Sequence, residues 1–279
     1  MYEKMSYKKM LETAGFSYLG NHAHSTKVRL SEEAGTVTYC IYMAPADLSG
    51  YNVCPNNKFC RQFCLNGSGH AKLDILSGKN RIQSARIKKA RLFFEDRELF
   101  MRIMVHEIEK CRRFAEKIGY AFAVRINGTS DLSPEDFILD GKNVLEIFPD
   151  VQFYDYTKVY SRINLIGKYE NYDLTFSYNG HNLRASKIFL EKGGKVAVVF
   201  ANQKMLPKTF AGFPVWDANS YDMRYLDPAG HVMGLHFHTT AANYDKEGNY
   251  IAPNSDFVVA DTNPLCGWDE PQILNVKKA

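Results

Sequence analysis

Three of the six cysteines in this 279-residue chain fall on one short, turn-rich stretch, and their spacing constrains the fold more than any other feature. Cys54, Cys60 and Cys64 form a C-x5-C-x3-C pattern between Gly50 and Gly67. Three thiols so close along a loop are better placed to converge on one metal than to link distant parts of a fold. We therefore predict a metal-cluster site on this loop.

The ligand set indicates which metal the loop holds. Sulfur ligands without a nearby histidine favour zinc or an iron-sulfur cluster, because tetrahedral sulfur coordination suits both. The spacing differs from the paired C-x2-C of zinc modules and from the C-x2-C-x2-C run of bacterial ferredoxins. Its five-residue gap allows the thiolates to surround a body larger than one zinc ion, which favours a [4Fe-4S] cluster. Structural zinc is one alternative, and unligated thiols or disulfides are the other.

A fourth ligand must come from elsewhere in the chain, or one iron stays open. Cys40 lies in an apolar run and Cys111 in a helical pattern, so both are expected to be structural. Cys266 lies in a turn-rich segment next to Trp268, whose ring can shield a cluster from solvent. We predict Cys266 as the fourth ligand, with an open iron site as the alternative.

Apolar runs alternate with helical or turn segments along most of the chain. Strands are expected at 36–43, 120–126, 151–156, 174–178 and 196–200, and near 215, 232–237 and 257–260; helices are expected over 77–118 with a break near 94–97, at a Ser133-capped start, at 159–168 and at 182–192. Strands separated by helices at this interval indicate parallel β-α units. We predict an α/β fold: a lead-in over 1–34, then a single-domain complete or partial (βα) TIM-like barrel over 35–279, with the cysteine loop after its first strand.

Composition and signals exclude several classes of protein. No apolar run is long enough to cross a bilayer, and the N-terminus lacks an apolar signal core. We therefore expect a cytoplasmic protein without a membrane partner, in which clustered cysteines favour metal binding over disulfides. No dinucleotide-binding or P-loop fingerprint is present, which weakens the doubly wound nucleotide folds.

One stretch concentrates positive charge, although the net charge is only +4. Its members are Lys79, Arg81, Arg86, Lys88, Lys89 and Arg91, all within one expected helix. This pattern is typical of a nucleic-acid face. A solvated helix flank is nevertheless the favoured interpretation, because Glu95, Asp96 and Glu98 follow at once.

Two resemblances to known families follow from these motifs. A cluster loop after the first strand, with Phe63 just before the last cysteine, resembles the radical S-adenosylmethionine barrel, although the spacing there is C-x3-C-x2-C. The bacteriophage gene product 88 family is a closer resemblance, carried by the cysteine loop, the strand 124–127 with its polar turn ending at Asp131, the strand 153–158 and the closing segment 266–269. This second resemblance covers roughly residues 36 to 275. It implies a phage origin, hence the cytoplasm of the infected host cell, and an iron-sulfur site, and it carries over no established reaction.

These readings leave three functional hypotheses. The first is an enzyme whose open iron binds S-adenosylmethionine, with Arg125, Asp131, Lys158 and Asn179 as candidates for binding a small-molecule substrate at the strand ends. The second is a non-enzymatic nucleic-acid-binding module with a structural iron-sulfur or zinc site. The third is a zinc-stabilised barrel enzyme. In it, His236 and His238 alternate on a strand, and ordinary packing and hydrogen bonding is the favoured interpretation over a second metal or catalytic site.

Overall fold

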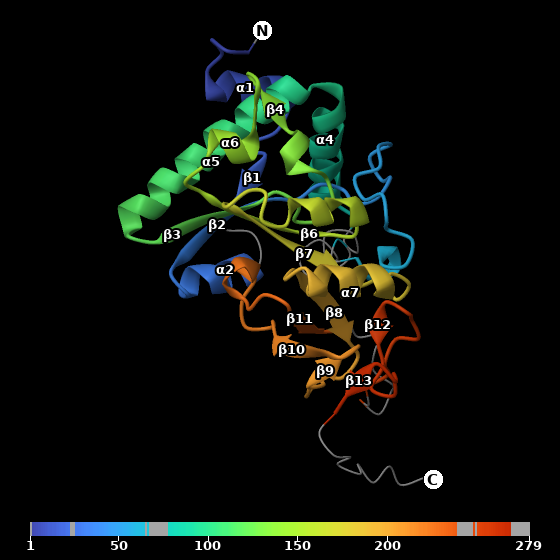
Figure 1. Ribbon diagram of the computed structural model, residues 1–279. Coiled ribbons are helices and arrows are strands. Elements are labelled where there is room, and N and C mark those ends of the chain that lie inside the picture. The colour runs from blue at the N-terminus through green and yellow to red at the C-terminus, as the bar shows by residue number, and fades with distance from the viewer. Residues whose placement is uncertain are drawn as a thin grey trace. The chain divides into compact units, whose positions relative to one another are not determined.

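The computed structural model describes residues 2–22, 26–64, 66, 78–238, 248 and 250–268 (Figure 1). The chain divides into two compact units. The first comprises Met1–Leu174 and Tyr221–Tyr225, and the second comprises Thr175–Ser220 and Leu226–Ala279. Both units combine helices with mostly parallel strands, which confirms the α/β class. No helix within the described ranges is long and apolar enough to cross a membrane.

The first unit holds a sheet whose strands lie in the order β1-β2-β3-β6-β7. Strands β2, β3 and β6 run parallel, whereas the edge strand β1 runs antiparallel to β2. The strands are β1 (Gly20–Asn21), β2 (Thr36–Ile41), β3 (Ala121–Arg125), β6 (Gln152–Thr157), the first part of β7 (Tyr172–Ser177) and a separate hairpin of β4 (Ile138–Leu139) and β5 (Lys142–Asn143). The α-helices are α1 (Tyr7–Ala14), α2 (Thr26–Glu33), α4 (Arg81–Glu95), α5 (Arg97–Ile118) and α6 (Val144–Ile147). Short 3-10 helices are η1 (Arg61–Phe63), η3 (Pro134–Asp136), η4 (Tyr160–Leu165) and η5 (Arg224–Leu226).

The two long helices α4 and α5 meet at Asp96, within the break expected near 94–97. Asp96 ends α4, and its carboxylate then caps α5 by accepting a hydrogen bond from the Leu99 amide at 3.1 Å. Helix α5 ends at Gly119, which adopts a left-handed conformation (φ 73°) that glycine accepts without a Cβ penalty. The local sequence therefore sets both boundaries of α5.

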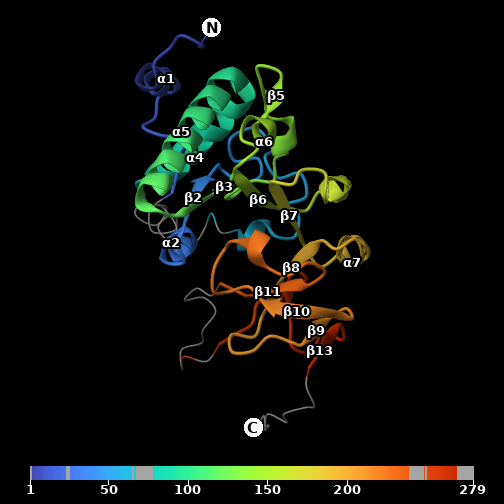
Figure 2. The same cartoon turned by 60° about the vertical axis from the view of Figure 1, so that its left-hand side comes forward.

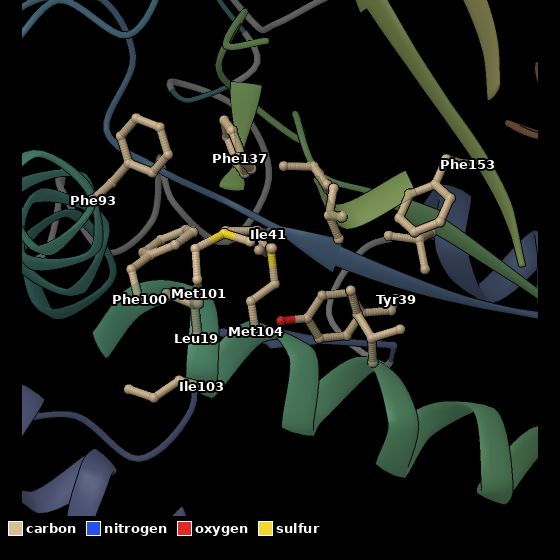
Figure 3. Packing of buried hydrophobic residues seen from close by; sticks show 14 of the residues in the cluster. Leu19, Tyr39, Ile41, Phe93, Phe100, Met101, Ile103, Met104, Phe137 and Phe153 are labelled. Carbon is tan, nitrogen blue, oxygen red and sulfur yellow. The ribbon is translucent and has the colours of Figure 1, made fainter. Parts of the chain in front are cut away.

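The core of the first unit forms between α5 and one face of the sheet. Side chains alternate across each strand, so Tyr39 and Ile41 of β2 share a face with Val124 of β3. In Figure 3 this face packs against the apolar stripe of α5, which includes Phe100 and Met104. Because all these side chains are fully buried, the hydrophobic effect holds helix and sheet together.

One charged side chain, a carboxylate, is buried within this core. Glu107 of α5 accepts four hydrogen bonds of 2.7–2.8 Å, from the hydroxyls of Tyr7 and Tyr39 and from the amides of Leu19 and Gly20. Figure 3 shows the Tyr39 hydroxyl directed toward α5. These bonds join α1, β1 and β2 to one helix, so the N-terminal segment is an integral part of the first unit. The domain boundary expected at residue 35 stays a prediction.

The second unit continues from β7 in the strand order β7-β8-β11-β10-β9-β13, with β12 also paired to β8 (Figure 2). Its elements are β8 (Lys195–Phe200), β9 (Thr209–Phe210), β10 (Phe213–Asp217), β11 (Val232–His236), β12 (Val258–Val259), β13 (Cys266–Gly267) and helix α7 (Leu183–Glu191). Strands β7, β8, β11 and β10 are parallel, and β9 runs antiparallel to both β10 and β13. Strand β11 lies between β8 and β10, although it follows both in the chain.

The TIM-like barrel is not confirmed, because the strands do not form a closed sheet. A barrel of this type needs parallel strands in sequential order around a closed ring. Here β1 is the edge strand of the first unit and β13 is the edge strand of the second. In addition, β11 lies between β8 and β10, so the spatial order of the strands differs from their order in the chain. Two expected helices are also shorter than predicted: 159–168 forms η4, and the Ser133 start yields only η3, without a side-chain cap at Ser133.

We predict that Glu107→Gln lowers the free energy of unfolding by about 3 kcal/mol, since buried donors that lose a charged acceptor are left unsatisfied. The glutamine amide offers one acceptor oxygen, and its NH2 group faces hydrogen-bond donors. Urea denaturation followed by circular dichroism measures the change. Glu116→Gln, at an exposed site on the same helix, is the matched control and should change stability little. Equal effects of both substitutions would contradict a central role for Glu107.

Candidate functional site

The cysteine loop follows β2 in the first unit, as the sequence predicts. None of the six cysteines, all of which lie in the described ranges, forms a disulfide. Cys54, Cys60 and Cys64 are half-buried, and helix η1 separates the last two, with Cys60 and Cys64 at its two ends. The thiols of Cys54 and Cys60 lie 3.7 Å from the carbonyl oxygens of Thr129 and Asn57. Both are weak hydrogen bonds. Backbone groups of Ala46 and Asn66 also hydrogen-bond to Cys54 and Cys64, respectively.

Backbone bonds fasten the loop to the carboxyl ends of the neighbouring strands. The amide of Asp131, in the turn after β3, donates to the Val53 carbonyl at 2.8 Å. The Asn56 side chain donates to the carbonyl of Lys158, just beyond β6, at 2.9 Å. At Gly128 a Cβ would lie 2.6 Å from the Ile41 carbonyl, so only glycine allows this close approach. The loop therefore lies over the ends of β3 and β6.

The Asp131 carboxylate ties these strand ends to each other. Its two oxygens accept hydrogen bonds from the Thr157 hydroxyl and the Lys158 amide, both at 2.7 Å. The guanidinium of Arg162 lies 3.7 Å away and forms a second ion pair with Glu135 at 2.9 Å. Asp131 thus has its hydrogen-bonding capacity largely taken up by the protein.

A second carboxylate lies beneath this turn, at Asp155 of β6. It accepts a hydrogen bond from the Asn127 amide at 2.8 Å and a long one, 3.5 Å, from the Tyr172 hydroxyl. Burial raises the pKa of Asp155 to about 7, although the Asn127 hydrogen bond and the charges of Arg162 and Arg125 oppose the rise. Asp155 is therefore a buried group that titrates near neutral pH.

The thiols interact electrostatically with each other and with two cations. Burial raises the pKa of Cys54 to about 11; Asp131 and Cys64 add to the rise, and Lys158 opposes it. Burial also raises the pKa of Cys64, to which Cys60 contributes, while Lys158 and Arg86 oppose the rise. Cys64 is thus coupled to both of the other loop cysteines, beside two positive charges.

The described residues do not assemble a complete metal site. Within the described ranges, no group of three or more His, Cys, Asp or Glu side chains is arranged to hold one metal ion. Cys266, the predicted fourth ligand, lies half-buried on β13 of the second unit, and burial raises its pKa to about 11.

The four predicted substrate-binding residues have different environments. Asp131 and Lys158 adjoin the cysteine loop. Arg125 of β3 is instead buried and forms an ion pair with Asp222. Burial lowers the pKa of Arg125, but Asp222 raises it well above its ordinary value. Asn179 lies in the second unit, where its side chain accepts a hydrogen bond from the His181 amide at 2.9 Å and shapes the turn before α7. Their roles toward a substrate stay predictions.

The proposed histidine pair does not share a strand. Strand β11 ends at His236, and His238 lies beyond it on an exposed segment. The Nδ1 atom of His236 lies 2.6 Å from the Asn202 carbonyl, which fixes the orientation of the ring.

Sequence reasoning missed three residues that shape these sites. Arg86 of α4 donates to the Asn66 side chain and lies over the Tyr42 ring, where it faces Cys64. Asp222 pairs with Arg125 across 97 positions of the chain, and Arg162 binds Glu135. No local motif marks such long-range pairs. For Arg162, the sequence offered one sign: a positive charge inside the apolar pattern of the helix expected at 159–168.

The fold and the loop define an α/β protein that carries a cysteine loop at the carboxyl ends of parallel strands. The family model for gene product 88 matches residues 10–250. Because this match covers most of the chain, the protein belongs to the gene product 88 family of phage proteins, as the sequence resemblance implied. The resemblance to radical S-adenosylmethionine enzymes is not supported. Comparison with curated proteins and with solved structures gave no match.

We predict that Asp155→Asn becomes more stable relative to the parent as the pH rises. The pKa of Asp155 is near 7 in the folded state and 3.8 when exposed, so the folded state binds more protons between these values. Ionisation at higher pH then costs the parent stability, on the order of 2 kcal/mol between about pH 5 and about pH 8, and the variant escapes this cost. Urea denaturation at both pH values measures it. The exposed Asp150→Asn is the control, and a pH-independent difference for Asp155→Asn would contradict the assignment.

Proposed function

We propose that this protein binds a [4Fe-4S] cluster through Cys54, Cys60 and Cys64, with Cys266 as the fourth ligand. The observation that carries the proposal is that Cys54, Cys60 and Cys64 are half-buried thiols without disulfides on one short loop, which hydrogen bonds hold over the ends of β3 and β6. The donor chemistry fits, because three thiols and no histidine favour zinc or iron-sulfur coordination. When bound, such a cluster supplies electron transfer or, at an open iron, a Lewis acid.

The nearby cations support this use of the thiols. Metals bind thiolates, so binding must displace protons from thiols whose pKa burial has raised. Lys158 and Arg86 reduce that cost because each lowers the pKa of Cys64, and Lys158 also lowers that of Cys54. A cluster with thiolate ligands carries negative charge, which the same cations stabilise.

The described conformation does not yet gather three ligands around one point. Binding therefore requires the loop thiols to move closer to one another. If Cys266 does not bind, one iron is open to S-adenosylmethionine or to a small-molecule substrate beside Lys158. If zinc binds instead, the site is structural.

We predict about four irons and four sulfides per chain in anaerobically purified protein, as a [4Fe-4S] cluster requires. Cys54→Ala, Cys60→Ala and Cys64→Ala should each lose the brown absorbance, because each removes a thiolate ligand. Cys111→Ala is the matched control, since Cys111 is a half-buried thiol on α5, and it should retain the cluster. Metal analysis together with visible and electron paramagnetic resonance spectra provides the measurement.

The outcomes separate the alternatives. Loss of the cluster, or of one iron, in Cys266→Ala would indicate a closed cluster, whereas an unchanged spectrum would indicate an open iron. In the second case, a shift of the resonance spectrum on addition of S-adenosylmethionine would support cofactor binding. Zinc alone, or equal iron in the loop variants and in Cys111→Ala, would overturn the proposal.

A further inference from the structure

The six basic residues around α4 do not lie on one surface. Lys89 is only 7% exposed and lies over the Tyr18 ring, with its ammonium 4.6 Å from the ring centre. Burial lowers the pKa of Lys89 to about 8. Arg86 faces inward to Asn66 and Cys64. Lys89 is thus buried and Arg86 half-buried, so the six basic residues do not form one face.

The remaining cations form a stripe on the outer side of α4. Arg81, Lys88 and Arg91 are all exposed and lie at positions i, i+7 and i+10, which fall on one side of an α-helix. Lys79, also exposed, precedes the helix. Within the described ranges, neither Arg81 nor Lys88 forms an ion pair, and Arg91 donates to the Ser49 carbonyl at 2.9 Å. Arg81 and Lys88 therefore present positive charge to the solvent, and the exposed Glu95 lies one turn beyond Arg91.

An exposed aromatic pair adjoins the end of this stripe. Phe94 follows Arg91 by three residues, so the two are neighbours on the helix surface. Its ring is 37% exposed and stacks on Tyr51 with ring centres 4.7 Å apart and planes 7° from parallel. Phe93 supports Phe94 from the interior through an edge contact of 5.1 Å. The exposed ring is thus held in a fixed orientation about one helical turn from Arg91.

We propose that this surface binds single-stranded nucleic acid. Phosphates would contact Lys79, Arg81, Lys88 and Arg91, and a base would stack on Phe94. Cations along a backbone track combined with a stacking ring are the features by which proteins hold single strands without sequence preference. A base within a duplex is already stacked, so Phe94 selects the single strand. Arg81 and Phe94 lie about 20 Å apart along the helix axis and about 140° apart around it, so a strand of several nucleotides would cross α4 obliquely. The proposal is independent of the metal, because it uses none of the cysteines.

Fluorescence anisotropy with labelled oligothymidylate and oligouridylate of about 20 nucleotides tests this, since known single-strand sites occupy roughly 4–16 nucleotides. Each neutralised phosphate contributes about −0.7 to the slope of log affinity against log salt, so four contacts predict a slope of about −2.8. The double variant Arg81→Ala/Lys88→Ala should reduce its magnitude by about 1.4. Phe94→Ala should weaken binding about tenfold and leave the slope unchanged.

Matched controls make the result specific. Lys8→Ala/Lys117→Ala removes two exposed cations from α1 and α5, and Phe114→Ala removes an exposed ring from α5; none should alter binding, and circular dichroism checks that every variant folds. Binding by both oligomers, or by one, supports the proposal. No binding at low salt, equal loss in the controls, or tighter binding to duplex with no effect of Phe94→Ala would overturn it.

Discussion

One residue, Asp131, links the cysteine loop to the ends of two strands. Its amide binds the loop at Val53, and its carboxylate binds Thr157 and the amide of Lys158 beyond β6. Segments that are far apart in the chain therefore meet at a single residue in the turn after β3. Parallel pairing makes this possible, because the carboxyl ends of β2, β3 and β6 lie at the same edge of the sheet. The loop is consequently positioned by backbone bonds and not by its thiols.

Three carboxylates of the first unit differ in the number of hydrogen bonds that they accept. Glu107 receives four short hydrogen bonds, two at each oxygen, and Asp131 receives two besides a nearby arginine. Asp155 receives one short bond and one long one, so desolvation outweighs its partners and raises its pKa. The pKa of Asp155 thus reflects both its burial and the few hydrogen bonds that it accepts.

Local periodicity predicted the elements well and their assembly poorly. The strand expected at 36–43 is β2 at Thr36–Ile41, and the helix break expected near 94–97 falls at Asp96, because propensity and capping are properties of neighbouring residues. Closure of the sheet depends on which distant strands pair, and nothing local indicates that β11 lies between β8 and β10. Asp131 and Lys158 met as predicted, since each follows a neighbouring parallel strand. The partner of Arg125 was not predictable, because Asp222 is 97 residues away.

Helix α4 connects the two surfaces for which we propose functions. Its inner side carries Arg86, whose charge acts on Cys64, and whose carbonyl accepts a hydrogen bond from the Ala44 amide at 3.1 Å. Its outer side carries Arg81 and Lys88, and Arg91 fixes the helix to Ser49, ahead of the cysteines. Adjacent residues differ by about 100° around a helix, which is why Lys88 is exposed while Lys89 is buried. A ligand that shifts α4 from outside would also move Arg86 relative to the thiols. Both proposals therefore depend on the placement of this one helix.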